Sequence, residues 1–204
     1  MIIATTTLAA GYASVPPGHL ATIVTSLEMV RPPLPRPERP VSPGLVLRPL
    51  TNRDPDTYRS LYRDVGAEWL WFSRLALADD ALAAILADEA VEILALRQAG
   101  RNVGMLELDF RRPGACELVF LGLTGDMIGT GLGGSLMGEA LRRAWSRPIA
   151  RFWLHTCTLD HPGALAFYRR FGFEPFATHV EIAPDPRLTG LLPRDCAPHV
   201  PLLG

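Results

Sequence analysis

The sequence predicts an α/β (α+β) protein with a mixed, mostly antiparallel central sheet, helices on its faces and an extra strand at the N-terminus. Stretches rich in β-branched residues alternate with stretches of helical spacing along the chain. Three strand-like runs between residues 91 and 123 are separated only by short turns, as in antiparallel hairpins. A loop with four glycines in six residues, Gly129–Gly134, stands directly before a helical run. With 204 residues, 48% of them hydrophobic, the chain can bury one sizeable core.

The first 44 residues are predicted to extend this domain. Residues 19–29, HLATIVTSLEM, are apolar and β-branched enough to form a strand. The segment 31–44 contains six prolines, which exclude a helix and a central strand and favour a semi-rigid linker. We expect the linker to let the strand pack on the edge of the sheet, in its own subunit or in a partner's. A homodimer is therefore one possible assembly.

Strand-like and helical patterns then alternate through the middle of the chain. Apolar residues from Tyr58 to Val65 recur on one side of a helical stretch, and the segment 99–102 is typical of a hairpin turn. The expected elements are a strand at 45–50, helices at 55–75 and 79–88, alternating runs at 91–100 and 102–114, and a strand at 116–123.

After the glycine loop the pattern predicts a helix to about Trp145, a strand at 151–159 and a short helix at 162–171. The short helix is expected to stop at Gly172, because glycine is typical of a left-handed C-cap. Residues 183–204 are rich in proline and are expected to form an irregular tail. The folded domain itself is expected to span residues 45–182, without internal repeats.

Composition excludes several classes of protein. The formal net charge is -1 and no block of basic residues exceeds two, so a nucleic-acid partner is not expected. No apolar run approaches the roughly 20 residues that a membrane span needs, and the N-terminal residues lack the basic region of a signal peptide. The three cysteines are widely separated and include no Cys-x-x-Cys pair, which fits a cytoplasmic protein without a disulfide framework.

The glycine loop has several possible interpretations. Gly129, Gly131 and Gly134 match the dinucleotide fingerprint Gly-x-Gly-x-x-Gly, but five residues separate the loop from the preceding strand and no acidic residue ends the next strand. The phosphate-cradling pattern fails because Ser135 follows Gly134 without a lysine. A turn chosen only for helix packing remains open. An anion site formed by free N–H groups at a helix N-terminus explains both the glycines and the helix, and a pyrophosphate fits it.

Two motifs resemble the GCN5-related N-acetyltransferase (GNAT) superfamily. The stretch Ile128–Gly133 is similar to the family motif Gln/Arg-x-x-Gly-x-Gly/Ala, and "HPGALAFYRRFGF", residues 161–173, resembles Asn-x-x-Ala-x-x-Phe-Tyr-x-x-x-Gly-Phe. A weaker resemblance runs upstream to Leu45, so about two thirds of the chain is covered. Ile128 and His161 depart from the motifs, which removes a side-chain donor near the pyrophosphate and an asparagine that often helps to hold the cofactor.

The resemblance implies a GNAT-type fold with acetyl-CoA as co-substrate and no metal. In the family, the strand before the loop splays from the next strand, and the pantetheine arm adds to it like a strand. Here those edges are expected at Leu121–Leu123 and at the start of the strand 151–159, with a backbone N–H near Leu123 to stabilise a tetrahedral intermediate. The residues expected to bind the cofactor are Leu121, Gly122, Leu123, Gly129, Thr130, Gly131, Leu132, Gly133, Gly134, Ser135 and His161.

Acetyl transfer to an amine requires a base. An amine of pKa about 10.4 is almost fully protonated at pH 7, and deprotonating it costs roughly 4 to 5 kcal/mol. Glu117 is similar in position to the general-base glutamate of histone-acetylating family members, although an ordinary solvated carboxylate is the alternative. Glu107 and Asp109 share one face of the neighbouring strand and are the reserve candidates for base or acceptor binding.

Tyr168 matches the family tyrosine that protonates the leaving thiolate. It could instead be a core ring beside Phe167 and Phe171, but helical spacing rotates it about 100° from Phe167. We therefore expect Tyr168 to be the general acid.

Other side chains carry competing interpretations. His155 and Cys157 lie on one strand face, but neighbours on one strand make poor attack geometry for covalent catalysis. Trp69, Trp71 and Phe72 either line an acceptor pocket or fill the core. Metal binding is not expected, because no usual ligand spacing occurs among the histidines and acidic residues.

The predicted function is an acetyl-CoA-dependent N-acetyltransferase that moves an acetyl group to a primary amine by direct attack in a ternary complex. The acceptor is expected to be a small-molecule or a protein amine. The main alternative is a non-catalytic acyl-CoA-binding or regulatory module of the same fold, and a dinucleotide oxidoreductase is the second.

Overall fold

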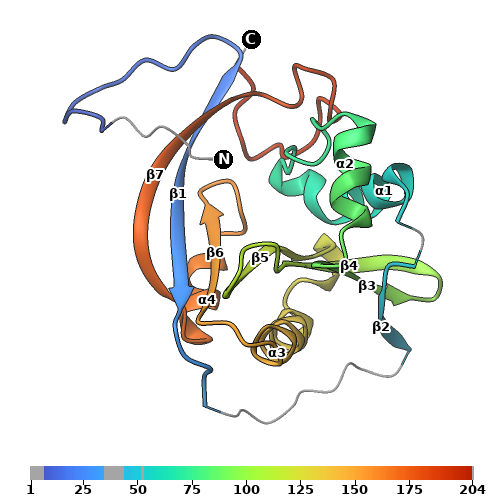
Figure 1. Cartoon of the computed structure of the whole chain (residues 1–204). Coiled ribbons are helices and arrows are strands. Elements are labelled where there is room, and N and C mark those ends of the chain that lie inside the picture. Colours follow the sequence, from blue (N-terminus) through green and yellow to red (C-terminus); the bar gives the residue numbers. More distant parts are fainter. Residues whose placement is uncertain (1–6, 35–43, 52, 204) are drawn as a thin grey trace.

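A computed structural model describes residues 7–34, 44–51 and 53–203 of the chain. Seven strands form one sheet in the order β2-β3-β4-β5-β6-β1-β7 (Figure 1). Every neighbouring pair is antiparallel except β5 and β6, which run parallel. The predicted mixed, mostly antiparallel sheet with flanking helices is therefore confirmed.

The strands are β1 (His19–Met29), β2 (Leu45–Pro49), β3 (Val91–Gln98), β4 (Arg101–Asp109), β5 (Ala115–Leu123), β6 (Arg151–Cys157) and β7 (Glu174–Pro184). The helices are α1 (Pro55–Gly66), α2 (Asp79–Ala87), α3 (Leu132–Trp145) and α4 (Ala164–Arg170), with short 3-10 turns η1 (Ala67–Trp69) and η2 (Gly125–Met127). None of the helices in the described part of the chain has the length and apolar character that crossing a bilayer requires.

Helix α1 begins and ends through local chemistry. The Asp54 side chain accepts a hydrogen bond from the Thr57 N–H at 3.0 Å, and Pro55 stands at the first helical position, where its missing N–H costs nothing. The helix ends at Gly66, earlier than the predicted residue 75, because the chain turns through a left-handed conformation at Leu70 with φ 53°. The aromatic segment after Gly66 thereby leaves the helix and becomes available to line a site.

The strand β1 lies inside the sheet of its own chain. It pairs with β6 through residues 24–29 and with β7 through residues 19–28. The predicted edge position for this strand is therefore wrong. The strand at this edge of the sheet is β7, which the sequence pattern did not predict, and β2 lies at the other edge. Leu27 and Met29 are buried in the same hydrophobic cluster as residues of α3 and β6, as expected of an interior strand.

The described residues form three hydrophobic clusters. The two larger clusters lie on opposite faces of the sheet: one packs against α3, and the other packs against α1 and α2 (Figure 1). The third, at the start of α3, includes Leu132 and Leu136. Beyond β7 the tail, as described through Leu203, has no helix or strand, yet Leu192 and Ala197 are buried in the core at α1 and α2. The buried Arg187 holds this tail through Asp185 and through the backbone carbonyl of Val200 at 2.9 Å.

Candidate active site

The parallel strands β5 and β6 separate after a short paired stretch. Residues 115–117 pair with 151–153, and beyond this point the two strands share no register. A cleft of about 1640 Å³ lies at the separation and extends between the helices on both faces. Residues 121–123 border it as predicted, but the start of β6 is paired, so the expectation for that strand is wrong. Because both strands run in the same direction, the second half of β6 faces the end of β5.

A β-bulge in β5 changes which face its side chains occupy. Glu107 pairs with Phe120 and Leu108 with Leu118, so Val119 is the extra residue. Leu118 packs into the core at α3, whereas Phe120 packs on the opposite side, against the core at α1. The bulge therefore places Phe120 on the same side of the sheet as Glu107.

The glycine loop leaves an open backbone at the start of α3. Gly129 and Gly131 adopt φ of 81° and 88°, which side chains rarely tolerate, and a Cβ at either position would meet no atom within 4 Å. A Cβ at Gly133 or Gly134 would make only ordinary contacts, at 3.6 and 3.9 Å. Close packing therefore does not explain the glycines, and no side chain caps the helix at Gly131. The Gly134 N–H already donates to the Gly131 carbonyl at 3.0 Å, whereas the N–H groups at the very start of α3 lie ahead of the helical hydrogen bonds and can face an anion.

Most of the predicted cofactor-binding residues line the cleft. Two do not: the Thr130 hydroxyl donates to the Met127 carbonyl at 2.6 Å, and Leu132 is buried in the core beside Leu136. The predicted residues that line the cleft are Leu121, Gly122, Leu123, Gly129, Gly131, Gly133, Gly134, Ser135 and His161. In His161 the Nδ1 atom accepts a hydrogen bond from the Gly163 N–H at 2.9 Å, next to the start of α4.

The outer part of the cleft, between α3 and α4, contains residues that the motifs did not identify as a site. Phe167 of α4 and Phe171, the residue after α4, have ring centres 5.0 Å apart in a tilted contact, and Arg142 and Arg170 also line the cleft. In the sequence, the basic residues in the last turns of α3 and α4 were the pattern that could have indicated this part of the cleft. Arg142 lies in the last turn of α3, at the opposite end of the helix from the glycine loop, and its Nε and Nη2 atoms donate to Glu139. The Arg170 guanidinium lies 6.0 Å from the centre of the Phe167 ring and favours an anionic ligand at this part of the cleft.

Tyr168 lies on α4 and lines the cleft. Its ring makes edge-to-face contacts with Phe167 at 5.5 Å and Phe173 at 6.3 Å, and in the described part of the chain its hydroxyl forms no hydrogen bond. Burial, together with the Asp160 carboxylate, raises the pKa of Tyr168 above its usual value. The phenol therefore stays protonated at neutral pH and can act as a proton donor.

Glu117 lies beside the cleft rather than in it. It lines a side pocket of about 280 Å³ that shares Ser73, Val119, Phe120 and His155 with the cleft. Burial, with a further contribution from Asp109, raises the pKa of Glu117 to about 7. Its Oε1 atom lies 3.7 Å from Nδ1 of His155, so the carboxylate and the imidazole form a pair at the junction.

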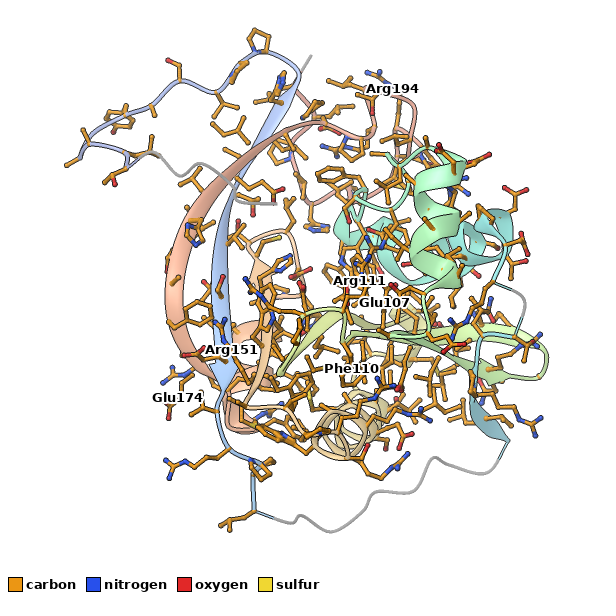
Figure 2. All side chains as sticks on the ribbon, viewed as in Figure 1. Glu107, Phe110, Arg111, Arg151, Glu174 and Arg194 are labelled. Atoms are coloured by element: carbon orange, nitrogen blue, oxygen red, sulfur yellow. The ribbon has the colours of Figure 1, made fainter. Side chains whose placement is uncertain are left out.

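The two reserve carboxylates, Glu107 and Asp109, each accept hydrogen bonds from an arginine. Glu107 is fully buried, and its oxygens accept hydrogen bonds from the Tyr58 hydroxyl at 2.5 Å and from Arg74 Nη2 at 2.6 Å. Burial acts to raise the pKa of Asp109, but hydrogen bonds from Arg111 hold that pKa below its usual value. Of the three carboxylates, Glu117 is the one without an arginine hydrogen bond in the described residues. Figure 2 shows Glu107 and Arg111 on the side of the sheet toward α1 and α2.

The aromatic residues after α1 line the cleft, and Trp71 also packs against the hydrophobic core at α1 and α2. Trp69, Trp71 and Phe72 all line the cleft, and Trp71 packs on Phe120 at 5.0 Å. The Trp71 indole N–H also donates to Asp160 Oδ1 at 3.2 Å, which fixes the ring. This wall is therefore preformed, as is usual for small-molecule sites.

The pair of His155 and Cys157 does not form a nucleophilic site. Both residues line the cleft, but burial and the Asp160 carboxylate raise the pKa of the Cys157 thiol. The thiolate needed for covalent catalysis is thereby disfavoured. Among the described residues, no group of three or more potential ligands could hold a metal ion.

Comparison with known proteins places this geometry in a family. The sequence profile of the Acetyltransferase (GNAT) family matches residues 56–173, more than half of the 204-residue chain. No curated protein matches the chain. A GCN5-related N-acetyltransferase from Kribbella flavida is a similar solved structure, with 20% identity and a TM-score of 0.53 over 85% of this chain and 63% of that one. The chain thus spans less than two thirds of the Kribbella protein.

Two further structures support the fold. A GCN5-related N-acetyltransferase from Sphaerobacter thermophilus matches with 18% identity and a TM-score of 0.52 over 83% of this chain and 52% of that one. An aminoglycoside acetyltransferase from an uncultured soil metagenomic sample, in complex with sisomicin, matches with 15% identity and a TM-score of 0.51 over 63% of this chain and 88% of that one. At these identities the likeness shows the fold. On the strength of the profile match, the chain belongs to the acetyltransferase (GNAT) family.

Proposed function

We propose that this protein is an acetyl-CoA-dependent N-acetyltransferase that transfers the acetyl group directly to a primary amine in a ternary complex. One observation carries the proposal. The cleft where β5 and β6 separate joins the open N-terminus of α3 to a protonated Tyr168 and adjoins the pair formed by Glu117 and His155. A binding site for a phosphorylated thioester, an acid and a base thus meet in one place.

The chain's own groups account for binding of acetyl-CoA. We assign the pyrophosphate to the N–H groups of residues 129–135, where the helix dipole adds to the attraction. Arg170 lines the cleft beside Phe167 and suits the remaining phosphate, whereas Arg142 is held by Glu139. Residues 121–123 present a strand edge without a β6 partner, along which an extended amide-containing arm can add.

The same residues supply the proton transfers. The amine nitrogen attacks the thioester carbonyl carbon, so a C–N bond forms and the C–S bond breaks. Glu117 accepts the amine proton, directly or through His155, because its pKa of about 7 matches neutral pH. Tyr168 gives its proton to the departing thiolate.

The test is acceptor-dependent release of coenzyme A thiol, measured with acetyl-CoA and a panel of amines that includes an aminoglycoside, a polyamine, amino acids and a lysine peptide. We expect release of coenzyme A thiol with at least one class of amine in this panel. A protein that binds acetyl-CoA and releases no thiol with any of them is the non-catalytic module instead.

Direct attack has its own test, because the sequence contains no lysine. Label from acetyl-CoA that remains on the denatured protein therefore cannot come from a lysine side chain. We expect no such label on the cysteines in the absence of acceptor. Stoichiometric label at Cys157, lost on adding an amine, would contradict direct attack.

A further inference from the structure

The side pocket next to Glu117 has the size of a functional group rather than of a whole substrate. Its volume is about 280 Å³, below the usual range for drug-sized sites. It opens beside the reaction point, because His155 and Phe120 line both the side pocket and the cleft. A group held there belongs to a molecule whose other part occupies the cleft.

Two arginines line the side pocket and retain unused donors. A guanidinium group carries five N–H donors. Arg74 donates through Nη2 to Glu107, and its Nε is buried without a partner. Arg111 donates to Asp109 through Nε and Nη2. The Arg74 guanidinium also interacts with the Tyr58 hydroxyl, and within the described residues Arg111 forms no hydrogen bond through Nη1.

The charges of the side pocket are balanced rather than uniformly acidic. Glu107 and Asp109 each neutralise one arginine, and the third carboxylate, Glu117, lies at the His155 side. A dense acidic surface, which would suit a polycation, is therefore not present here. Guanidinium donors together with a carboxylate that has no arginine partner in the described residues match a zwitterion.

We propose that the acceptor is an α-amino acid with an apolar side chain, whose carboxylate binds Arg74 and Arg111 in the side pocket. This inference rests on the proposed N-acetyltransferase function. The amine then lies at Glu117 and His155, where the cleft and the side pocket meet. The apolar side chain packs on the wall that Trp71 and Phe72 form.

The test compares amino acids with their decarboxylated amines on the wild-type protein. The matched pairs are L-phenylalanine with phenethylamine, L-tryptophan with tryptamine, and L-methionine with 3-(methylthio)propylamine. We expect kcat/KM to be higher for the amino acid of each pair by at least about tenfold, mainly through KM, since charged hydrogen bonds are lost with the carboxylate. Equal values within each pair would overturn the inference and leave the transferase function standing.

Two variants test whether the side pocket causes the preference for the amino acid over its decarboxylated amine. Arg111→Gln, at an exposed rim position, is expected to bring the ratio within each pair toward one. Arg112→Gln, the neighbouring exposed arginine outside the side pocket, is the matched control and should keep the wild-type ratio. A ratio unchanged in Arg111→Gln would overturn the assignment. If no member of any pair releases thiol while another amine of the panel does, the inference is overturned and the transferase function stands. If acetyl-CoA binds and no amine of the panel releases thiol, the proposed function itself fails, and the inference fails with it.

Discussion

The Glu117 carboxylate lies 3.7 Å from Nδ1 of His155, at the point where β5 and β6 stop pairing. This pair marks the junction of the large cleft and the polar side pocket, because His155 lines both and Glu117 lines the second. The location gives the carboxylate partial burial without an arginine partner. Those two conditions raise its pKa toward neutral and suit it to accept a proton from an amine.

Replacing Glu117 is expected to remove the base. Glu117→Gln should lower kcat by about 10²- to 10⁴-fold, the usual contribution of general base catalysis. In the wild type, kcat/KM should rise with pH through about 7, because the ionised carboxylate is the active form and burial raises its pKa to about that value. A pH profile of thiol release checks both points. Glu89→Gln, an exposed glutamate that lines neither the cleft nor the side pocket, serves as the control. If Glu117→Gln still shows the rise of kcat/KM through about pH 7, ionisation of Glu117 is not the cause of that rise.

Replacing Tyr168 tests the proton donor. Tyr168→Phe should lower kcat by about 10²-fold or more, since the phenol no longer protonates the thiolate. Acetyl-CoA affinity should hardly change, because the phenyl ring keeps its contacts with Phe167 and Phe173. Steady-state kinetics together with calorimetry separate the two effects. An unchanged kcat would assign the ring to packing alone.

The buried ion pair of Glu107 and Arg74 is expected to act on stability. Glu107→Ala leaves the largely buried guanidinium of Arg74 without its carboxylate, which should cost about 3 to 5 kcal/mol of unfolding free energy. Urea denaturation measures this, with the exposed Glu89→Ala as the matched control. A loss below about 1 kcal/mol, the range of surface pairs, would show that the pair is not structural.

The interior position of β1 predicts that the domain needs its N-terminal strand. A shortened chain that begins at Gly44 should lose cooperative thermal unfolding, because β6 and β7 would each lose the strand that lies between them. A chain that begins at Pro16 keeps β1 and should unfold like the full protein. A cooperative transition at the wild-type Tm in the chain from Gly44 would contradict this role.

Local pattern was enough to locate β1, the hairpin between β3 and β4, and the helix after the glycine loop. In the hairpin, Ala99 and Gly100 both adopt positive φ, as a two-residue turn requires. The sequence could not show which strands are neighbours. Pairing of β1 with both β6 and β7 depends on contacts between distant segments, so the interior position of β1 was missed.

The sequence motifs predicted which residues belong to the site, but they did not predict the contacts between those residues. The glycine loop and Tyr168 were found because each motif is local. The contact between Glu117 and His155 was not, because it arises from the register of two parallel strands separated by α3. The tail beyond β7 is irregular as expected, but its anchoring by Arg187 depends on hydrogen bonds to carbonyls that composition does not reveal.

The central claim is that the open N-terminus of α3 holds the pyrophosphate of acetyl-CoA, and calorimetry of acetyl-CoA binding tests it most directly. Gly131→Glu places a side chain and a negative charge at the helix cap, where φ is 88°. Gly100→Glu is the matched control: φ is 84°, a Cβ there also meets no atom within 4 Å, and the residue lies outside the cleft. We predict micromolar binding to the wild type and to Gly100→Glu, and loss of binding in Gly131→Glu with its thermal unfolding still cooperative. Wild-type protein that does not bind acetyl-CoA, or a Gly131→Glu variant that binds it equally well, would contradict the account.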